Sequence, residues 1–435
     1  MNLDPLQIFI AGDGTETDAV MQALVTGSDV AAVRPVSLDG LPTTSRRITV
    51  RHDGFAPDTA LLPPSARTFS GHQLLQEYFI MPEKFNFVSL QGVGAALADS
   101  DARLFDVVFG LEEPDERLAE AVRAESFRLH CVPIINLFKR RGDRISIQPG
   151  EALHHVVVDR TQPQSFEVYR VESVHSVRQG SAERTHYAPV FDSFDNEGDG
   201  QARDARSGYF SVRRTKRLVS GSRDRAYLGT DTHVALSGPD RGPASMDAQR
   251  LVISSICTNR GRPLELSNKS QYAIQTVAPV TKATPLVGPT PPRLPLAQDD
   301  AGWTLINALS LNHLSFSQDT ASNAQWLSRT LGLFADPSNA VHRQITRAFG
   351  ALTARPINRR IPGEGPITYG RGLEFTLGVD TDSLRGVGPF ILSSVLERFF
   401  ARAVSVNSFT ETAMATADGL EIARWPARIG TRHVL

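Results

Sequence analysis

The side chains best suited to chemistry are eleven histidines and 47 acidic residues, and most stand outside any recognisable pattern. A metal site or an acid–base pair needs such groups at fixed spacing. His154 and His155 are adjacent, so on a strand their side chains point to opposite faces and cannot share one metal. The sequence has neither an H-E-x-x-H pattern nor a paired C-x-x-C. We therefore predict structural or solvent-facing histidines, and neither a metal site nor a cofactor.

The segment from Asp195 to Gly200 resembles the start of a calcium-binding loop, with carboxylates at positions one, three and five. Such a loop requires a bidentate glutamate at position twelve, and Arg206 stands there. A cation cannot replace a pair of carboxylate oxygens. We predict a solvated hairpin loop instead.

Motifs for nucleotide binding and hydrolysis also fail. Gly92-Val93-Gly94 does not extend to G-x-G-x-x-G because Leu97 occupies the last position, and the sequence lacks a G-x-S-x-G elbow. Adjacent carboxylates such as Glu112-Glu113 lie in polar segments with no sign of the burial that separates two pKa values for acid–base catalysis. The sequence predicts no catalytic residue and no enzymatic activity.

Cations concentrate between residues 203 and 225, where Tyr209 and Phe210 lie among eight basic side chains. Aromatic residues among cations can form a nucleic-acid surface. Alternation along a strand separates Arg213 from Arg214, however, so only half of the charge shares a face. We interpret the stretch as an exposed strand and turn that suits an acidic partner, and keep nucleic-acid binding as the alternative.

Composition favours an ordinary globular protein. The 435 residues have a formal net charge of -1, with 41% hydrophobic and 21% charged residues, which argues against wholesale disorder and against a polyanion-gripping protein. No apolar run approaches the length of a membrane span, and the start, MNLDPLQIFIAGDG, lacks the basic and apolar regions of a secretory signal. We expect a cytoplasmic protein without direct membrane insertion.

Hydrophobic periodicity predicts an α+β, multi-domain chain with a β-rich middle body. Residues 1–125 alternate strands and helices, including a helix that opens at Ser70 and stops at Pro82. Residues 126–278 are a series of Val-, Ile- and aromatic-rich strands, which predicts an antiparallel sandwich or barrel. Residues 279–297 form a Pro-rich linker, and residues 298–435 form a second α+β domain.

Four long strings resemble one family, the type VI secretion baseplate subunit TssF, also called ImpG or VasA. They are LLQEYFIMPEKFNFVSL at 74–90, NLFKRRGDRISI at 136–147, LVISSICTNRGRP at 251–263 and the C-terminal RWPARIGTRHVL. Their order and spacing agree with the family from about residue 70 to the end. The family's usual N-terminal helical region is not recognised in this sequence.

The resemblance implies a structural scaffold, similar to the wedge proteins of contractile phage tails. Expected partners are TssG, TssK, a second TssF copy, the VgrG spike, TssE and the sheath, in a baseplate docked at the inner membrane complex that seeds tube and sheath growth. The resemblance implies no catalysis. The alternatives are a β-rich carbohydrate-acting hydrolase and a nucleic-acid-binding module that uses residues 203–225.

The last long helix supplies the candidate interface residues. Leu392, Leu396 and Phe399 form its inward stripe at helical spacing. Aromatic and arginine side chains are favoured at interface cores, so we predict that three residues beside the stripe approach a second subunit: Arg398, Phe400 and Arg402. In the alternative interpretation, Phe400 widens the core stripe.

Overall fold

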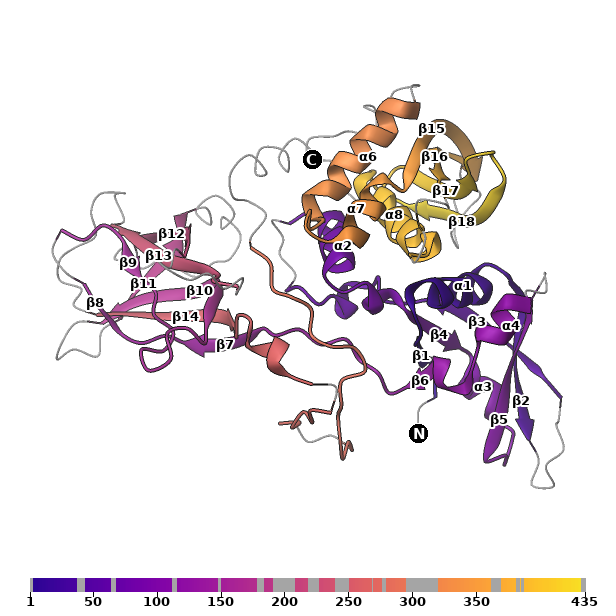
Figure 1. Ribbon diagram of the computed structural model, residues 1–435, viewed down its shortest axis with the longest axis horizontal. Coiled ribbons are helices and arrows are strands. Elements are labelled where there is room, and N and C mark those ends of the chain that lie inside the picture. The colour runs from indigo at the N-terminus through magenta and orange to yellow at the C-terminus, as the bar shows by residue number, and fades with distance from the viewer. Residues whose placement is uncertain are drawn as a thin grey trace. The chain divides into compact units, whose positions relative to one another are not determined.

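The computed structural model describes residues 3–36, 44–63, 68–111, 116–147, 150–177, 184–190, 208–217, 227–238, 250–267, 269–275, 279–294, 320–360, 369–380, 384 and 387–431 (Figure 1). The chain folds into two compact units. Residues Met1–Ile134 and Leu296–Leu435 form the first unit, and residues Ile135–Pro295 form the second. The α+β class is therefore confirmed, and the four-part division into domains stays a prediction. Among the described residues, no helix is long and apolar enough to cross a membrane.

The first unit opens with a six-stranded antiparallel sheet in the order β5-β2-β3-β4-β1-β6. Its strands are β1 (Leu6–Ile10), β2 (Ser28–Val36), β3 (Arg46–His52), β4 (Phe87–Gln91), β5 (Leu104–Leu111) and β6 (Phe127–Leu129). Its α-helices are α1 (Gly14–Val25), α2 (Ser70–Ile80), α3 (Val93–Leu97) and α4 (Glu116–Ala121), and its 3-10 helices are η1 (Pro57–Thr59), η2 (Pro82–Phe85) and η3 (Ala124–Ser126). The helix at Ser70 and its stop at Pro82 are confirmed, because a proline ring cannot continue the α-helical ladder.

The C-terminal part of the same unit is a four-stranded sheet in the order β15-β16-β17-β18. The strands are β15 (Phe349–Arg360), β16 (Tyr369–Val379), β17 (Phe409–Thr416) and β18 (Glu421–Ile429), preceded by helices α6 (Thr320–Phe334) and α7 (Ala340–Arg347). Strands β16 and β17 are parallel, and α8 (Pro389–Ala403) connects them as a parallel pair requires.

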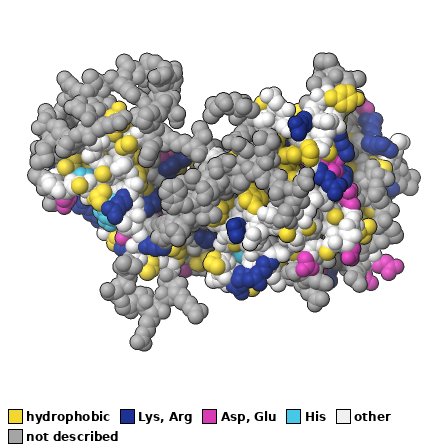
Figure 2. All heavy atoms as spheres, turned by 90° about the horizontal axis from the view of Figure 1, so that it is seen from above, with side chains coloured by type: hydrophobic (Ala, Val, Ile, Leu, Met, Phe, Trp, Pro, Cys, Tyr) yellow, Lys and Arg dark blue, Asp and Glu magenta, His cyan; other side chains and the backbone are white. Residues whose placement is uncertain are grey.

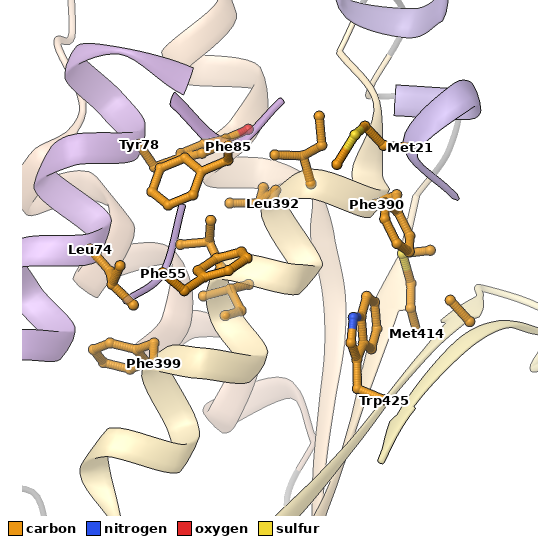
Figure 3. Packing of buried hydrophobic residues seen from close by; sticks show 14 of the residues in the cluster. Met21, Phe55, Leu74, Tyr78, Phe85, Phe390, Leu392, Phe399, Met414 and Trp425 are labelled. Carbon is orange, nitrogen blue, oxygen red and sulfur yellow. The ribbon is translucent and has the colours of Figure 1, made fainter. Parts of the chain in front are cut away.

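One hydrophobic core joins these two sheets and the helices between them. Figure 3 shows side chains from α1, α2, α8 and β18 in one cluster, with Phe390 and Trp425 stacked at 5.5 Å between ring centroids. The expected inward stripe of α8 is confirmed, since Leu392, Leu396 and Phe399 are all buried. N-terminal and C-terminal residues therefore share one core.

The second unit is a curled sheet in the order β7-β14-β10-β11-β12-β13-β9, with β8 also paired to β14. The strands are β7 (Phe138–Arg141), β8 (Ile145–Ser146), β9 (His154–His155), β10 (Glu167–Val177), β11 (Arg184–Pro189), β12 (Gly208–Lys216), β13 (Thr230–Ser237) and β14 (Arg250–Thr258). The N–H of Asp143 donates to Val157 O at 3.0 Å, which links the segments that follow β7 and β9. The described strands thus curl toward a barrel.

One prediction for this unit is wrong in detail. Strands β11 and β12 are parallel, so the sheet is mixed and these strands are not the two arms of a hairpin. Strand alternation and turn residues mark where strands lie, but they do not say which strands become neighbours, because that depends on contacts distant in sequence. The acidic segment 195–200 and Arg206 lie outside the described residues. In the Pro-rich segment, the described residues 279–294 contain no helix or strand.

Candidate assembly site around helix α8

The N-terminus of α8 is capped by a residue from the other end of the chain. Asp18 lies on α1 and is 3% exposed. Its carboxylate accepts hydrogen bonds from the Phe390 N–H at 2.9 Å and the Ile391 N–H at 2.8 Å. Two of the N–H groups that every helix start leaves without a partner are thereby satisfied. Burial raises the pKa of Asp18 to about 7, although both hydrogen bonds act in the opposite direction.

The close approach of α1 depends on glycine at the residue before α8. A Cβ placed on Gly388 would lie 1.9 Å from both Cβ and Cγ of Asp18. Pro389 then opens the helix, where its missing N–H costs nothing. The sequence thus combines a small residue, a rigid first position and a distant carboxylate at one helix end.

The middle of α8 makes a second set of polar contacts. Glu397 is almost fully buried and accepts from the Arg428 guanidinium of β18 at 2.6 Å. Arg398 Nε lies 3.2 Å from the other Glu397 oxygen, and its guanidinium stands over the Phe55 ring at 4.9 Å. Burial raises the pKa of Glu397, while Arg428 opposes the shift. These contacts fix α8 to β18 and to the segment that follows β3.

The end of α8 is tied to the N-terminal half by Arg402. Its guanidinium donates to Ser70 O at 2.8 Å and to Phe55 O at 2.7 Å. Phe400, two residues earlier, is 1% exposed and stacks on Phe375 of β16 at 4.3 Å between ring centroids. Phe400 thus lies where the core interpretation puts it. An approach of Arg398, Phe400 and Arg402 to a second subunit stays a prediction.

Arg402→Met is expected to lower the free energy of unfolding of the isolated chain by about 2 kcal/mol, because two charge-assisted hydrogen bonds are lost. Arg402→Lys should recover only part of the loss, since an ammonium cannot reproduce the planar fork. The measurement is urea denaturation followed by circular dichroism. Arg329→Met, on the exposed face of α6, is the control and should change stability by less than about 0.5 kcal/mol. Equal stability of the Arg402 and Arg329 variants would contradict the internal role.

A buried ion pair holds the segment before α2 in place. Glu77 of α2 and Lys84 of η2 pair through Oε2 and Nζ, with their side chains 2% and 1% exposed. The other Glu77 oxygen accepts from the backbone N–H groups of Leu61 at 3.1 Å and Leu62 at 3.0 Å. Burial lowers the pKa of Lys84, while the Glu77 carboxylate opposes the shift.

Sequence reasoning missed both Asp18 and the Glu77–Lys84 pair. Helical periodicity places Glu77 beside the apolar stripe of α2, and nothing local shows that a lysine seven residues later becomes buried. Asp18 lies 372 residues from Phe390. The one available signal was the resemblance, because Glu77 and Lys84 both fall within the string at 74–90.

Two histidines of the first unit are held in environments that disfavour their charged form. Burial lowers the pKa of His52 and of His72 to about 4. On β9, His154 is buried and His155 is exposed, so the two point to opposite faces as expected. Among the described residues, no group of three or more His, Cys, Asp or Glu side chains could hold a metal ion.

The basic stretch is divided between the two faces of β12. Arg213 is exposed, whereas the guanidinium of Arg214 donates to Tyr169 O inside the unit. Arg203, Arg206, Arg223 and Arg225 lie outside the described residues. On the face in Figure 2, Lys and Arg side chains form separate groups, some beside acidic ones. The described basic residues of the stretch thus do not form a continuous nucleic-acid surface by themselves.

A pocket of about 60 Å³ lies at one end of the curled sheet. Three carboxylates line it, and each has a partner: Asp159 pairs with Arg140 at 2.7 Å. Glu167 accepts from Thr230 N at 2.7 Å and Thr230 Oγ1 at 2.6 Å, and Asp231 lies 3.9 Å from Arg217 Nε. Substrate pockets are several times larger, about 300–1,000 Å³. The pocket does not favour the hydrolase alternative.

Comparison with known proteins gives a consistent result. The family model "Type VI secretion system, TssF" matches residues 1–432. The chain is 36% identical to the type VI secretion system component TssF1 of Pseudomonas aeruginosa over 443 aligned positions, which cover 99% of this chain and 70% of that protein. Its fold is similar to a chain in the cryo-electron microscopy structure of the type VI secretion system TssK-TssF-TssG baseplate subcomplex, with a TM-score of 0.72, 24% identity, and coverage of 100% of this chain and 76% of that chain.

Proposed function

This chain belongs to the TssF family of type VI secretion system proteins, and we propose that it is a structural subunit of the baseplate that assembles with TssG and TssK. The observation that carries the proposal is the family match over residues 1–432 together with 36% identity to TssF1 over 99% of the chain. The fold similarity to the TssK-TssF-TssG subcomplex agrees with it.

The role we propose is a wedge that acts through shape and contact. The wedge contains a second copy of the chain and surrounds the VgrG spike, with TssE and the sheath as further neighbours. Its place is the cytoplasm, in a baseplate docked at the inner membrane complex, where tube and sheath growth begin. The resemblance of the four long strings to the family supports these finer statements.

The contacts of α8 are consistent with a subunit that transmits force. A wedge must transmit force between partners without deforming, so its elements need rigid connections. Helix α8 is hydrogen-bonded to Asp18 of α1, to the carbonyl groups of Phe55 and Ser70, and to Arg428 of β18. These contacts join the two ends of the chain within one unit.

We also propose that the protein has no catalytic activity of its own. Three of the buried carboxylates of the first unit are paired with basic side chains: Glu77 with Lys84, Glu397 with Arg428, and Glu411 with Arg424 at 2.8 Å. The fourth, Asp18, is held by the N–H groups of Phe390 and Ile391. A carboxylate held by an arginine or lysine cannot readily act as a general acid. Its chemistry is better suited to holding elements together.

Co-expression with TssG and TssK from the same genome tests the proposal. We expect the three proteins to co-elute in size-exclusion chromatography after affinity capture of this chain. A parallel capture from cells that lack this chain should recover neither TssG nor TssK. Elution of a folded chain without TssG would contradict the baseplate role.

A further inference from the structure

The strand β5 is a long edge strand with little of the usual protection, namely one acidic side chain, Asp106, and an irregularity in its pairing with β2 between Ser28 and Val30. An open edge presents alternating N–H and C=O groups that can pair with another chain. Proteins block such edges with proline, lysine, short strands or covering elements. Strand β5 spans eight residues, LFDVVFGL, which include neither proline nor lysine. Among the described residues, no strand pairs with its far edge.

The other sheet ends in the described structure carry these protective features. Strand β6 has three residues and β9 has two. Strand β15 contains Pro356, β18 contains Pro426, and β7 is basic from Lys139 to Arg141. Of the sheet ends in the described structure, β5 is therefore the least protected, which suggests that its edge is used.

The β2–β5 ribbon is also poorly supported by the rest of its sheet. Strand β2 pairs with β5 from Ser28 to Val36, but with β3 only from Ala31 to Val33 (Figure 1). A two-stranded ribbon is marginally stable in water without further packing. On its outer face Leu104 is 70% exposed and Val108 is 40% exposed. Further strand pairing would stabilise this ribbon and cover apolar surface.

We propose that β5 pairs antiparallel with β5 of a second copy of this chain, which joins the two six-stranded sheets edge to edge. This inference rests on the proposed function, which includes a second copy, and it names the surface that the two copies share. A two-fold axis perpendicular to the sheet would relate them, so the same strand serves on both sides.

Symmetry and charge select the register of this pair. A two-fold axis perpendicular to the sheet leaves the outer faces of both sheets on the same side of the joined sheet. Residues opposite each other must therefore belong to the same face. A register centred on Asp106 would place two carboxylates opposite each other, which is unfavourable. A register centred on Val107 would place Asp106 against Val108 and cover a carboxylate with an apolar side chain.

The register centred on Val108 avoids both problems. Val108 faces Val108 of the second copy on the outer face, and Asp106 faces Gly110. Without a side chain at residue 110, the Asp106 carboxylate stays open to water and keeps its ion pair with Arg34 at 2.7 Å. On the inner face Val107 faces Phe109, which continues the apolar layer that both side chains already contact. The strand is therefore complementary to itself.

The contact is expected to be weak in isolation. One strand pair covers less surface than the roughly 1,200–2,000 Å² typical of stable complexes. Contacts with TssG and TssK would raise the effective concentration of the two copies. A covalent trap in the assembled complex is therefore the appropriate test.

The test is disulfide cross-linking of Val108→Cys in a Cys131→Ser background, within the complex that contains TssG and TssK. At the two-fold axis the two Cα atoms lie about 4.5–5.5 Å apart, within the range of a disulfide. Val30→Cys is the matched control because Val30 of the neighbouring strand β2 is 37% exposed and lies on the same face of the sheet as Val108. Val30 lies opposite Gly110, two residues from the axis, so two Val30 Cα atoms would be more than three strand spacings, over about 14 Å, apart and too far to bridge.

We expect a dimer on non-reducing gels for Val108→Cys and none for Val30→Cys. Val108→Lys should weaken self-association about tenfold in analytical ultracentrifugation, because two lysines would meet at the axis, whereas Leu420→Lys at a distant exposed site should not. Equal cross-linking of both cysteine variants, or of neither, would overturn the edge pairing. If TssG and TssK still co-elute in that case, the proposed function stands and only this interface is wrong.

Discussion

Lys84→Met is expected to lower the free energy of unfolding of the first unit by about 3–5 kcal/mol, because Glu77 would remain as a buried charge without its partner. The pair is enclosed, with 2% and 1% of the two side chains exposed, so water cannot replace the lost ammonium group. Glu77 also holds the backbone N–H groups of Leu61 and Leu62, and its protonation would weaken both contacts. Differential scanning calorimetry should show the melting temperature falling by about 10 °C.

The double variant Glu77→Gln, Lys84→Met distinguishes charge from shape. Glutamine keeps a carbonyl oxygen for the two backbone N–H groups and leaves no buried charge, so the double variant should be more stable than Lys84→Met. Lys282→Met, at an exposed lysine, serves as the surface control and should melt within about 1 °C of the parent. If the double variant is no more stable than Lys84→Met, the contribution of Lys84 to stability does not come from its ion pair with Glu77.

The sequence was sufficient where a signal is local. The apolar stripe of α8 and the stop of α2 at Pro82 follow from helical spacing and from the covalent geometry of proline. The β-rich character of the middle of the chain follows from the density of β-branched and aromatic residues, but the boundary does not, since Phe127–Leu129 pairs with β1 in the first unit.

The sequence was insufficient where partners are distant along the chain. The parallel pairing of β11 with β12 cannot be inferred from either strand alone. The approach of Asp18 to Phe390 joins residues separated by 372 positions. The candidate site has the same limit, because Arg402 was recognisable as a cation beside a helix stripe, but its acceptors, the carbonyl groups of Phe55 and Ser70, are backbone atoms that no residue type identifies.

Loss of the Asp18 carboxylate is the second large effect that we expect. Asp18→Ala would leave the N–H groups of Phe390 and Ile391 buried without an acceptor, at a cost of about 2–5 kcal/mol. The two N–H groups donate to different carboxylate oxygens, and Asp18→Asn keeps only one acceptor, so it should recover about half of that loss. Asp13→Asn, at the exposed N-cap of α1, is the matched control and should cost little because asparagine caps as well as aspartate. An Asp18→Ala variant as stable as the parent would contradict the capping role.

The pH dependence of stability, compared between the parent and Asp18→Asn, tests the buried carboxylate directly. The pKa of Asp18 is about 7 in the folded protein and near 3.8 in the unfolded chain, so the unfolded state releases the proton first. The parent therefore loses stability as pH rises from about 4 to 7, by up to about 4 kcal/mol, and the loss levels off above pH 7. Asp18→Asn has no such proton, so its stability relative to the parent should increase over this range. Because all other titrating groups are shared, a difference between the two proteins that stays constant from pH 4 to pH 8 would show that Asp18 is ionised throughout, and that its two helix N–H donors outweigh the cost of burial.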